Sequence, residues 1–151
     1  MRESKIKVIK VRGIREVAEK IKGRAYNTII VVEEPSRRPP LKKDESEIIR
    51  EYFKAIMENG EFKVKMETAI NRVKKRKDAM MLVKGIEKIL NTIAVLTVEN
   101  SKINVTAIIL KGENAQKIIN TLIFLQILQE DLSLSTGLDI GQICIFIPII
   151  R

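Results

Sequence analysis

The sequence predicts an α/β fold with α+β character, in which helices pack on one mixed sheet of five strands. Short apolar runs alternate along the chain with longer segments whose apolar residues recur every three or four positions. Two early apolar runs flank a short helical segment, which indicates a right-handed strand–helix–strand unit. Two later runs are joined by only four residues, which indicates an antiparallel hairpin. The predicted order is therefore β-α-β-α-α-β-β-α-β, in a single domain of residues 1–151.

Composition favours a compact protein with an aliphatic core. Apolar residues make up 45% of the 151 residues and aromatic residues only 4%. The 26 isoleucines, with abundant lysine and glutamate, are typical of proteins from thermophiles. The lone cysteine, Cys144, excludes an internal disulfide and is expected to be a reduced core thiol in a cytoplasmic protein. We recognise no signal peptide or membrane-spanning run, and expect no membrane partner.

The first third of the chain predicts two parallel strands and a basic arm. Lys5–Arg12 and Thr28–Glu33 are the strands, and Ile14–Lys22 has a helical apolar face between them. Residues 34–44 follow (EPSRRPPLKKD), where three prolines exclude a helix. This Pro-rich arm is either a solvated linker or a semi-rigid docking arm for phosphates or an acidic protein.

Helical periodicity dominates the middle of the chain. One helix is expected over about 44–58, and a longer one over 61–91, where apolar positions flank four consecutive cations, Lys74–Lys77. Either the long helix breaks near Asp78, or the cations form a basic girdle that projects toward solvent or a polyanion. A competing interpretation makes Glu61–Met66 a short strand; we prefer the helix.

The C-terminal part predicts a hairpin, a helix and a final strand. Thr92–Val98 and Ile103–Leu110 form the hairpin, a helix spans about 113–131, and Ser133–Gly141 loops back to the strand Gln142–Ile150. The final strand is nearly uncharged, so we expect it at the sheet centre or at a subunit interface.

The predicted helix over 113–131 is apolar nearly all round. Phe124 and Leu128 fall on the side where solvent would be expected. Either they form an oligomer interface, or the loop that follows the helix buries them.

Charge is distributed unequally along the chain. Residues 1–91 hold 24 Lys/Arg and 14 Asp/Glu, whereas residues 92–151 hold 4 and 5. The basic first part is expected to face water, nucleic acid or an acidic protein partner. The candidate nucleic-acid-binding residues are the cations of the arm and of the long helix: Arg37, Arg38, Lys42, Lys43, Arg72, Lys74, Lys75, Arg76 and Lys77. Because aromatic residues are few, binding would be directed to the phosphate backbone.

The sequence contains little catalytic material. It has no histidine, which excludes His-dependent triads and most zinc sites, and we expect no metal or cofactor. The most plausible catalytic group is an acidic cluster near the arm: Glu33, Glu34, Asp44, Glu45 and Glu47.

Three functions therefore remain open. The first hypothesis is a small non-catalytic protein that binds nucleic-acid phosphates through the arm and the basic helix. The alternative is an assembly subunit or homo-oligomeric interaction protein that uses its apolar C-terminal helix and strand. The third is a metal-dependent nuclease, in which Glu61-Phe62-Lys63 would form an E-x-K element if it lay on a strand.

Overall fold

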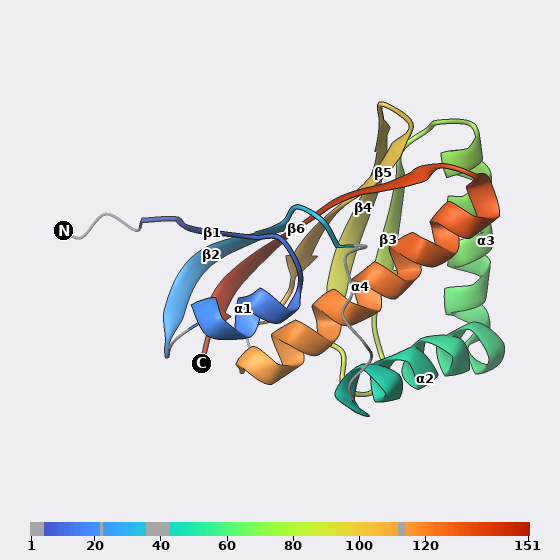
Figure 1. Ribbon diagram of the computed structural model, residues 1–151. Coiled ribbons are helices and arrows are strands. Elements are labelled where there is room, and N and C mark those ends of the chain that lie inside the picture. Colours follow the sequence, from blue (N-terminus) through green and yellow to red (C-terminus); the bar gives the residue numbers. More distant parts are fainter. Residues whose placement is uncertain (1–4, 22, 36–42, 112–113) are drawn as a thin grey trace.

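The computed structural model describes residues 5–21, 23–35, 43–111 and 114–151 (Figure 1). This part of the chain contains four helices and six strands. In chain order they are β1 (Lys7–Val11), α1 (Arg15–Lys20), β2 (Ala25–Val32), α2 (Lys43–Glu58), α3 (Gly60–Lys74), β3 (Ala79–Val83), β4 (Thr92–Glu99), β5 (Lys102–Ile109), α4 (Ala115–Thr136) and β6 (Asp139–Ile150).

All six strands form one mixed sheet, in the spatial order β1-β2-β6-β5-β4-β3. β1 and β2 run parallel, and β6 runs antiparallel to β2 and parallel to β5. β5, β4 and β3 follow as antiparallel neighbours. The mixed sheet, the parallel β1–β2 pair, the β4–β5 hairpin and the central place of the C-terminal strand confirm the predictions. The predicted number of five strands is wrong.

The sixth strand, β3, lies where the sequence predicted that the long helix would continue. α3 ends at Lys74, and Ala79–Val83 pairs with β4 at the edge of the sheet. The segment that follows is irregular, with positive φ at Gly85 and Lys88. The apolar residues of 79–83 suit a helical face and a half-buried strand equally well, and pairing with β4 decides for the strand. The predicted break near Asp78 is confirmed, although a strand follows it.

The helices pack on one side of the sheet (Figure 1). α1 packs against β1, α4 against β5 and β6, and α3 against β3 and β4. α2 forms an outer layer that packs mainly on α4 and α3. Tyr52 of α2 is fully buried there, with its ring centroid 5.9 Å from that of Phe62 of α3 and 5.3 Å from that of Phe124 of α4. Its hydroxyl donates a hydrogen bond to Asp131 of α4.

α4 is longer and more deeply buried than predicted. It continues to Thr136 and ends at Gly137, whose φ of 76° is left-handed, so much of the predicted loop over 133–141 is helix. The sheet covers one side of α4, and α2 and α3 cover the other. Phe124 and Leu128 are therefore fully buried within one chain. Of the two alternatives, an exposed oligomer interface is wrong and burial is confirmed, although α2, α3 and the sheet rather than the following loop cover this helix. No described helix is long and apolar enough to cross a membrane.

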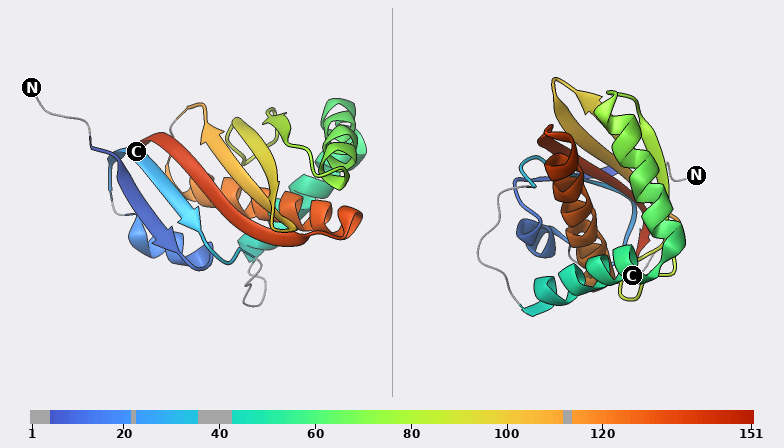
Figure 2. Two further views of the ribbon diagram at one scale, coloured as in Figure 1. Left: turned by 90° about the horizontal axis from the view of Figure 1, so that it is seen from above. Right: turned by 90° about the vertical axis from the view of Figure 1, so that its right-hand side faces the viewer.

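The two faces of the sheet differ in what covers them. Strand side chains alternate between the faces, and Ile30, Val105 and Ile145 are fully buried against the helices. We call the opposite face the uncovered face, because no helix of the described residues packs on it (Figure 2). It carries Ile29 and Phe146, among other residues that are not fully buried.

A β-bulge sets which side chains of β6 reach each face. The pairing of β5 with β6 shifts between Ile103 and Val105, so Gly141 and Gln142 together oppose Asn104. Asn104 Oδ1 accepts a hydrogen bond of 2.9 Å from the backbone N–H of Gln142. A Cβ on Gly141 would lie 2.1 Å from Asn104 Oδ1, so the bulge requires glycine. Because of this extra residue, Ile143, Ile145 and Ile147 of β6 all point to the side of the sheet that the helices cover.

Candidate functional site

The predicted basic girdle is the C-terminal end of α3. Asn59 caps the start of this helix by accepting a hydrogen bond of 3.1 Å from the backbone N–H of Phe62. Phe62, Met66, Ala69 and Val73 recur at helical spacing and are buried, which fixes one side of α3 to the core. The cations around and beyond Val73 consequently point away from the core.

α3 ends in a Schellman motif, which turns the chain away from the helix axis. The backbone N–H of Lys77 donates to the carbonyl of Arg72, and that of Arg76 donates to the carbonyl of Val73, both at 2.9 Å. Arg76 has a left-handed φ of 57°, where glycine is the usual residue because it has no Cβ. A non-glycine residue costs about 1 kcal/mol in this conformation. The chain therefore keeps a cation at a position where glycine would be more stable.

Three of these cations line a shallow hollow of about 230 Å³. Arg72, Lys75 and Lys77 surround it together with Thr68 and Asn71. The Thr68 hydroxyl donates a hydrogen bond of 3.0 Å to the backbone carbonyl of Val64 within the helix. The Asn71 amide can donate to phosphate oxygens, and the cations can neutralise the phosphate charge. The hollow therefore has the chemistry of an anion site.

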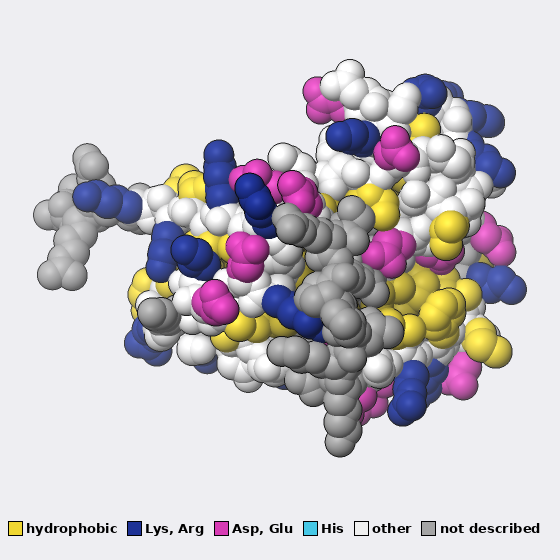
Figure 3. Space-filling model, in the orientation of Figure 1, with side chains coloured by type: hydrophobic (Ala, Val, Ile, Leu, Met, Phe, Trp, Pro, Cys, Tyr) yellow, Lys and Arg dark blue, Asp and Glu magenta, His cyan; other side chains and the backbone are white. Residues whose placement is uncertain are grey.

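Hydrogen bonds orient both arginines at this end of the helix. Arg72 Nε donates to the backbone carbonyl of Asp78 at 2.6 Å, and Arg76 Nη1 donates to Ser101 Oγ in the β4–β5 turn at 3.1 Å. Figure 3 shows Lys and Arg side chains gathered at this end of the molecule. We call the set the α3 cations: Arg72, Lys74, Lys75, Arg76 and Lys77.

The α3 cations are all exposed, and none pairs with a carboxylate of the described residues. The C-terminal end of a helix carries a partial negative charge, which stabilises part of the positive charge of the α3 cations. The rest is available to an anionic ligand.

The structure does not bring the start of α2 next to the α3 cations. Arg37, Arg38 and Lys42 lie outside the described residues, and Lys43 is the first residue of α2. α2 and α3 meet at Asn59 and lead away from it in different directions (Figure 1). Each helix is about 22–24 Å long at 1.5 Å per residue, so Lys43 and the α3 cations lie at opposite ends of the pair.

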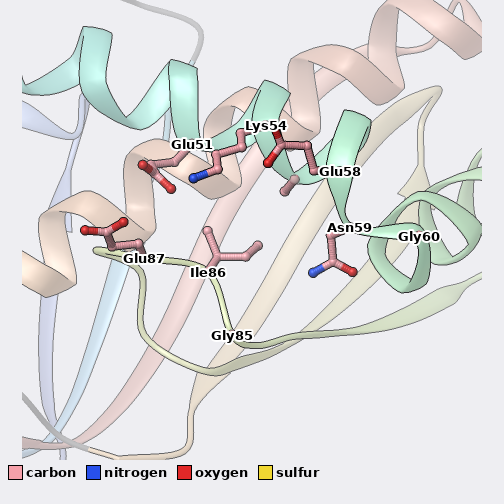
Figure 4. A pocket seen from close by; sticks show the side chains of 9 residues that line it. Glu51, Lys54, Glu58, Asn59, Gly60, Gly85, Ile86 and Glu87 are labelled. Carbon is pink, nitrogen blue, oxygen red and sulfur yellow. The ribbon is translucent and has the colours of Figure 1, made fainter.

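A larger hollow, of about 470 Å³, lies between α2 and the segment after β3 (Figure 4). Glu51, Glu58 and Glu87 surround it, with Lys54 between the first two. These charged side chains are exposed or half-buried and therefore remain solvated. No group of three or more His, Cys, Asp or Glu side chains in the described residues is arranged to hold a metal ion. We assign this hollow no ligand.

The predicted acidic cluster is divided among structural ion pairs. Glu45 Oε1 lies 2.9 Å from Arg15 Nε and ties α2 to α1. Glu47 Oε2 lies 3.0 Å from Lys88 Nζ and ties α2 to the segment after β3. Both glutamates that follow β2 are exposed at the end of that strand. The side chain of Asp44 lies outside the described part of the structure, and the four described carboxylates of the cluster show no shared site.

The E-x-K element has helical geometry. Glu61 and Lys63 lie in the first turn of α3, which confirms the preferred helix. Two residues along a helix are about 200° apart, so these side chains point to different sides. Glu61 instead pairs with Lys65 at 3.0 Å, and this hydrogen-bonded cation lowers the pKa of Glu61. The strand geometry on which the nuclease interpretation depended is absent here.

The uncovered face is the feature that sequence reasoning missed. The nearly uncharged run over 142–150 predicted a strand at the sheet centre or at a subunit interface. β6 lies in the interior of the sheet, and the helices cover only one of its faces. Cys144 lies half-buried on the uncovered face rather than in the core, and partial burial raises the pKa of its thiol. Apolar runs without alternation were the sequence signal that could have indicated an apolar second face.

Comparison with known proteins adds no assignment. The sequence matches no protein-family model, and a search of curated proteins found no significant match. The function is therefore argued from the geometry of the chain.

Proposed function

We propose that this protein is a non-catalytic nucleic-acid-binding protein that holds the phosphate backbone at the end of α3. The observation that carries the proposal is the hollow in which Arg72, Lys75 and Lys77 lie around the amide of Asn71, a neutral hydrogen-bond donor. Lys74 and Arg76 flank the hollow and add two further cations for neighbouring phosphates. Several cations at one helix end can neutralise several neighbouring phosphates of a nucleic-acid strand.

Binding of this kind is directed to the backbone rather than to bases. Base recognition in single strands uses aromatic side chains on which bases stack. Tyr26 and Phe53 are the most exposed aromatic side chains of the described residues, and they lie on β2 and α2. The hollow itself has cations, an amide and a hydroxyl. We therefore expect weak dependence on sequence and strong dependence on salt.

The test is the fluorescence anisotropy of labelled duplex DNA and single-stranded RNA, titrated at several salt concentrations. Five phosphate contacts on duplex DNA give a slope of log K against log salt of about −4 to −5. The triple variant Lys74→Gln, Lys75→Gln, Lys77→Gln should reduce the magnitude of that slope by about 2–3 and weaken binding at least tenfold.

The matched control is Lys20→Gln, Arg24→Gln, Lys54→Gln, which removes three exposed cations from other elements. It lowers the net charge by the same amount and should leave the slope nearly unchanged. Equal losses in both triple variants would mean that net charge alone is recognised. Absence of binding by the natural sequence at low salt would refute the proposal.

A further inference from the structure

The uncovered face is apolar across the whole width of the sheet. Strand register places one side chain from each strand in a row: Val8, Ile29, Phe146, Ile108, Ile93 and Leu82. None of the six is fully buried, although four lie on interior strands. Ile108, on the interior strand β5, is 43% exposed. A single chain therefore leaves a row of apolar side chains in contact with water.

A second row continues this surface. It contains Val31, Cys144, Val95 and the exposed Thr106 on interior strands, and Met80, 74% exposed, on β3. The only charged residue in the two rows is Lys10, at the β1 edge. The two rows cover about four residues of six strands spaced about 4.8 Å apart, which is an apolar area on the order of 400 Å²; with the more polar rows on either side, the face over about seven residues is on the order of 600–700 Å². That area approaches the roughly 800 Å² per partner of a stable protein interface.

The charges around this face identify its occupant. Glu33, Glu99 and Lys102 line a polar depression of about 360 Å³ with Asn104 and Gln142, next to the bulge. An apolar centre with a polar rim of both signs is the usual anatomy of a protein interface. Because the centre is almost uncharged, it has no complementarity to nucleic acid or to a strongly charged protein.

A second copy of the chain meets these requirements. A two-fold contact sets the apolar surface against an identical apolar surface and buries no unpaired charge at its centre. The α3 cations lie at the end of a helix on the other side of the sheet, so the net charge of +9 is not concentrated in the contact. Two sheets can pack face to face about 10 Å apart through side chains of this size.

We infer that two copies of this chain associate through the uncovered faces of their sheets and form a two-layer sheet sandwich with the helices outside. This inference rests on the apolar rows and is independent of nucleic-acid binding. The dimer buries Ile108 and Phe146 near the centre of the contact and shields Cys144 in the adjacent row.

Sedimentation velocity over a dilution series tests the inference. The natural sequence should sediment with twice the 17.2 kDa mass of one chain. Ile108→Lys places a charge at the centre of the contact and should raise the dissociation constant at least about 100-fold. Met57→Lys is the matched control: Met57 is 83% exposed on α2, on the helical side, and its substitution should leave the dimer intact.

Two further measurements keep the result decisive. If Ile108→Lys fails to fold, Ile93→Glu on the neighbouring strand β4 replaces it as the test variant and should also dissociate the dimer. Circular dichroism checks the folding of both variants. Cys144 should react more slowly with a thiol reagent in the natural dimer than in either dissociated variant. A natural sequence that sediments as a monomer throughout the series would overturn the inference. So would a dimer that both folded variants retain.

Discussion

The two faces of the sheet consist of the same strands and similar side chains, yet helices bury only one of them. Ile30 is fully buried under the helices, and its chain neighbour Ile29 points to the uncovered face, where it is only partly buried. A sheet covered on one side usually alternates apolar and polar residues. Here the row through Ile29 and Ile108 is apolar on the uncovered face as well, so along this row the two faces differ in their contacts rather than in their composition. The difference shows that apolar residues on a strand do not by themselves determine which face the helices of the chain cover.

The largest expected effect compares Ile30→Ala with Ile29→Ala. At protein concentrations low enough for single chains to predominate, Ile30→Ala should lower the free energy of unfolding by about 2–5 kcal/mol, because it opens a cavity under the helices. Ile29→Ala should cost about 1 kcal/mol or less. Denaturant unfolding measures both.

Protein concentration sharpens this comparison. If the uncovered faces associate, the cost of Ile29→Ala should rise as concentration increases, because the dimer contributes to stability. Equal costs for the two variants in dilute solution would show that Ile29 is as well covered as Ile30 within one chain.

A smaller effect is expected at the bulge that determines which β6 side chains reach each face. Gly141→Ala should lower the free energy of unfolding by about 1–3 kcal/mol, because the new methyl group would collide with Asn104 Oδ1. Gly60→Ala is the control, since a Cβ there meets no atom within 4 Å at the start of α3. That change should be neutral or slightly stabilising. Equal destabilisation by both would indicate that the bulge does not constrain β6.

The smallest effect concerns the outer layer over the covered face. Tyr52→Phe removes the hydrogen bond from α2 to Asp131 and should cost about 1–2 kcal/mol near neutral pH. Denaturant unfolding of both proteins measures this cost. An unchanged free energy would mean that ring packing alone holds α2 on α4.

The same pair of proteins should respond differently to alkaline pH. Burial, and then the hydrogen bond to Asp131, raises the pKa of Tyr52 above its ordinary value of 10.0. Above pH 10.0 only the unfolded chain releases this proton, so the contribution of Tyr52 to stability is present below that pH and declines above it. The stability difference between natural protein and variant should shrink by about 1.4 kcal/mol per pH unit there. A constant difference across this range would contradict the raised pKa.

Candidate sites could be predicted only where their residues are neighbours in the sequence. Lys74–Lys77 were recognised because they are consecutive, and the helix end holds them on one exposed surface. Thr68 and Asn71 join the hollow through helical spacing, which a search for charge alone does not detect. The apolar row that contains Ile29 and Ile108 could not be predicted, because it depends on the register of strands far apart in the chain.

By itself the sequence determined the elements whose signals are local. The parallel β1–β2 pair and the β4–β5 hairpin follow from the short connections between their strands. The end of α3 follows from the four consecutive cations, Lys74–Lys77, which interrupt the apolar face of the helix just before Asp78. Only the tertiary structure decided that residues 79–83 form a strand and that the middle of α4, residues 121–129, is buried on all sides. Periodicity shows which side of an element is apolar, but the partner of each side depends on contacts between distant segments. For the same reason, the uncovered face became visible only once six strands were placed side by side.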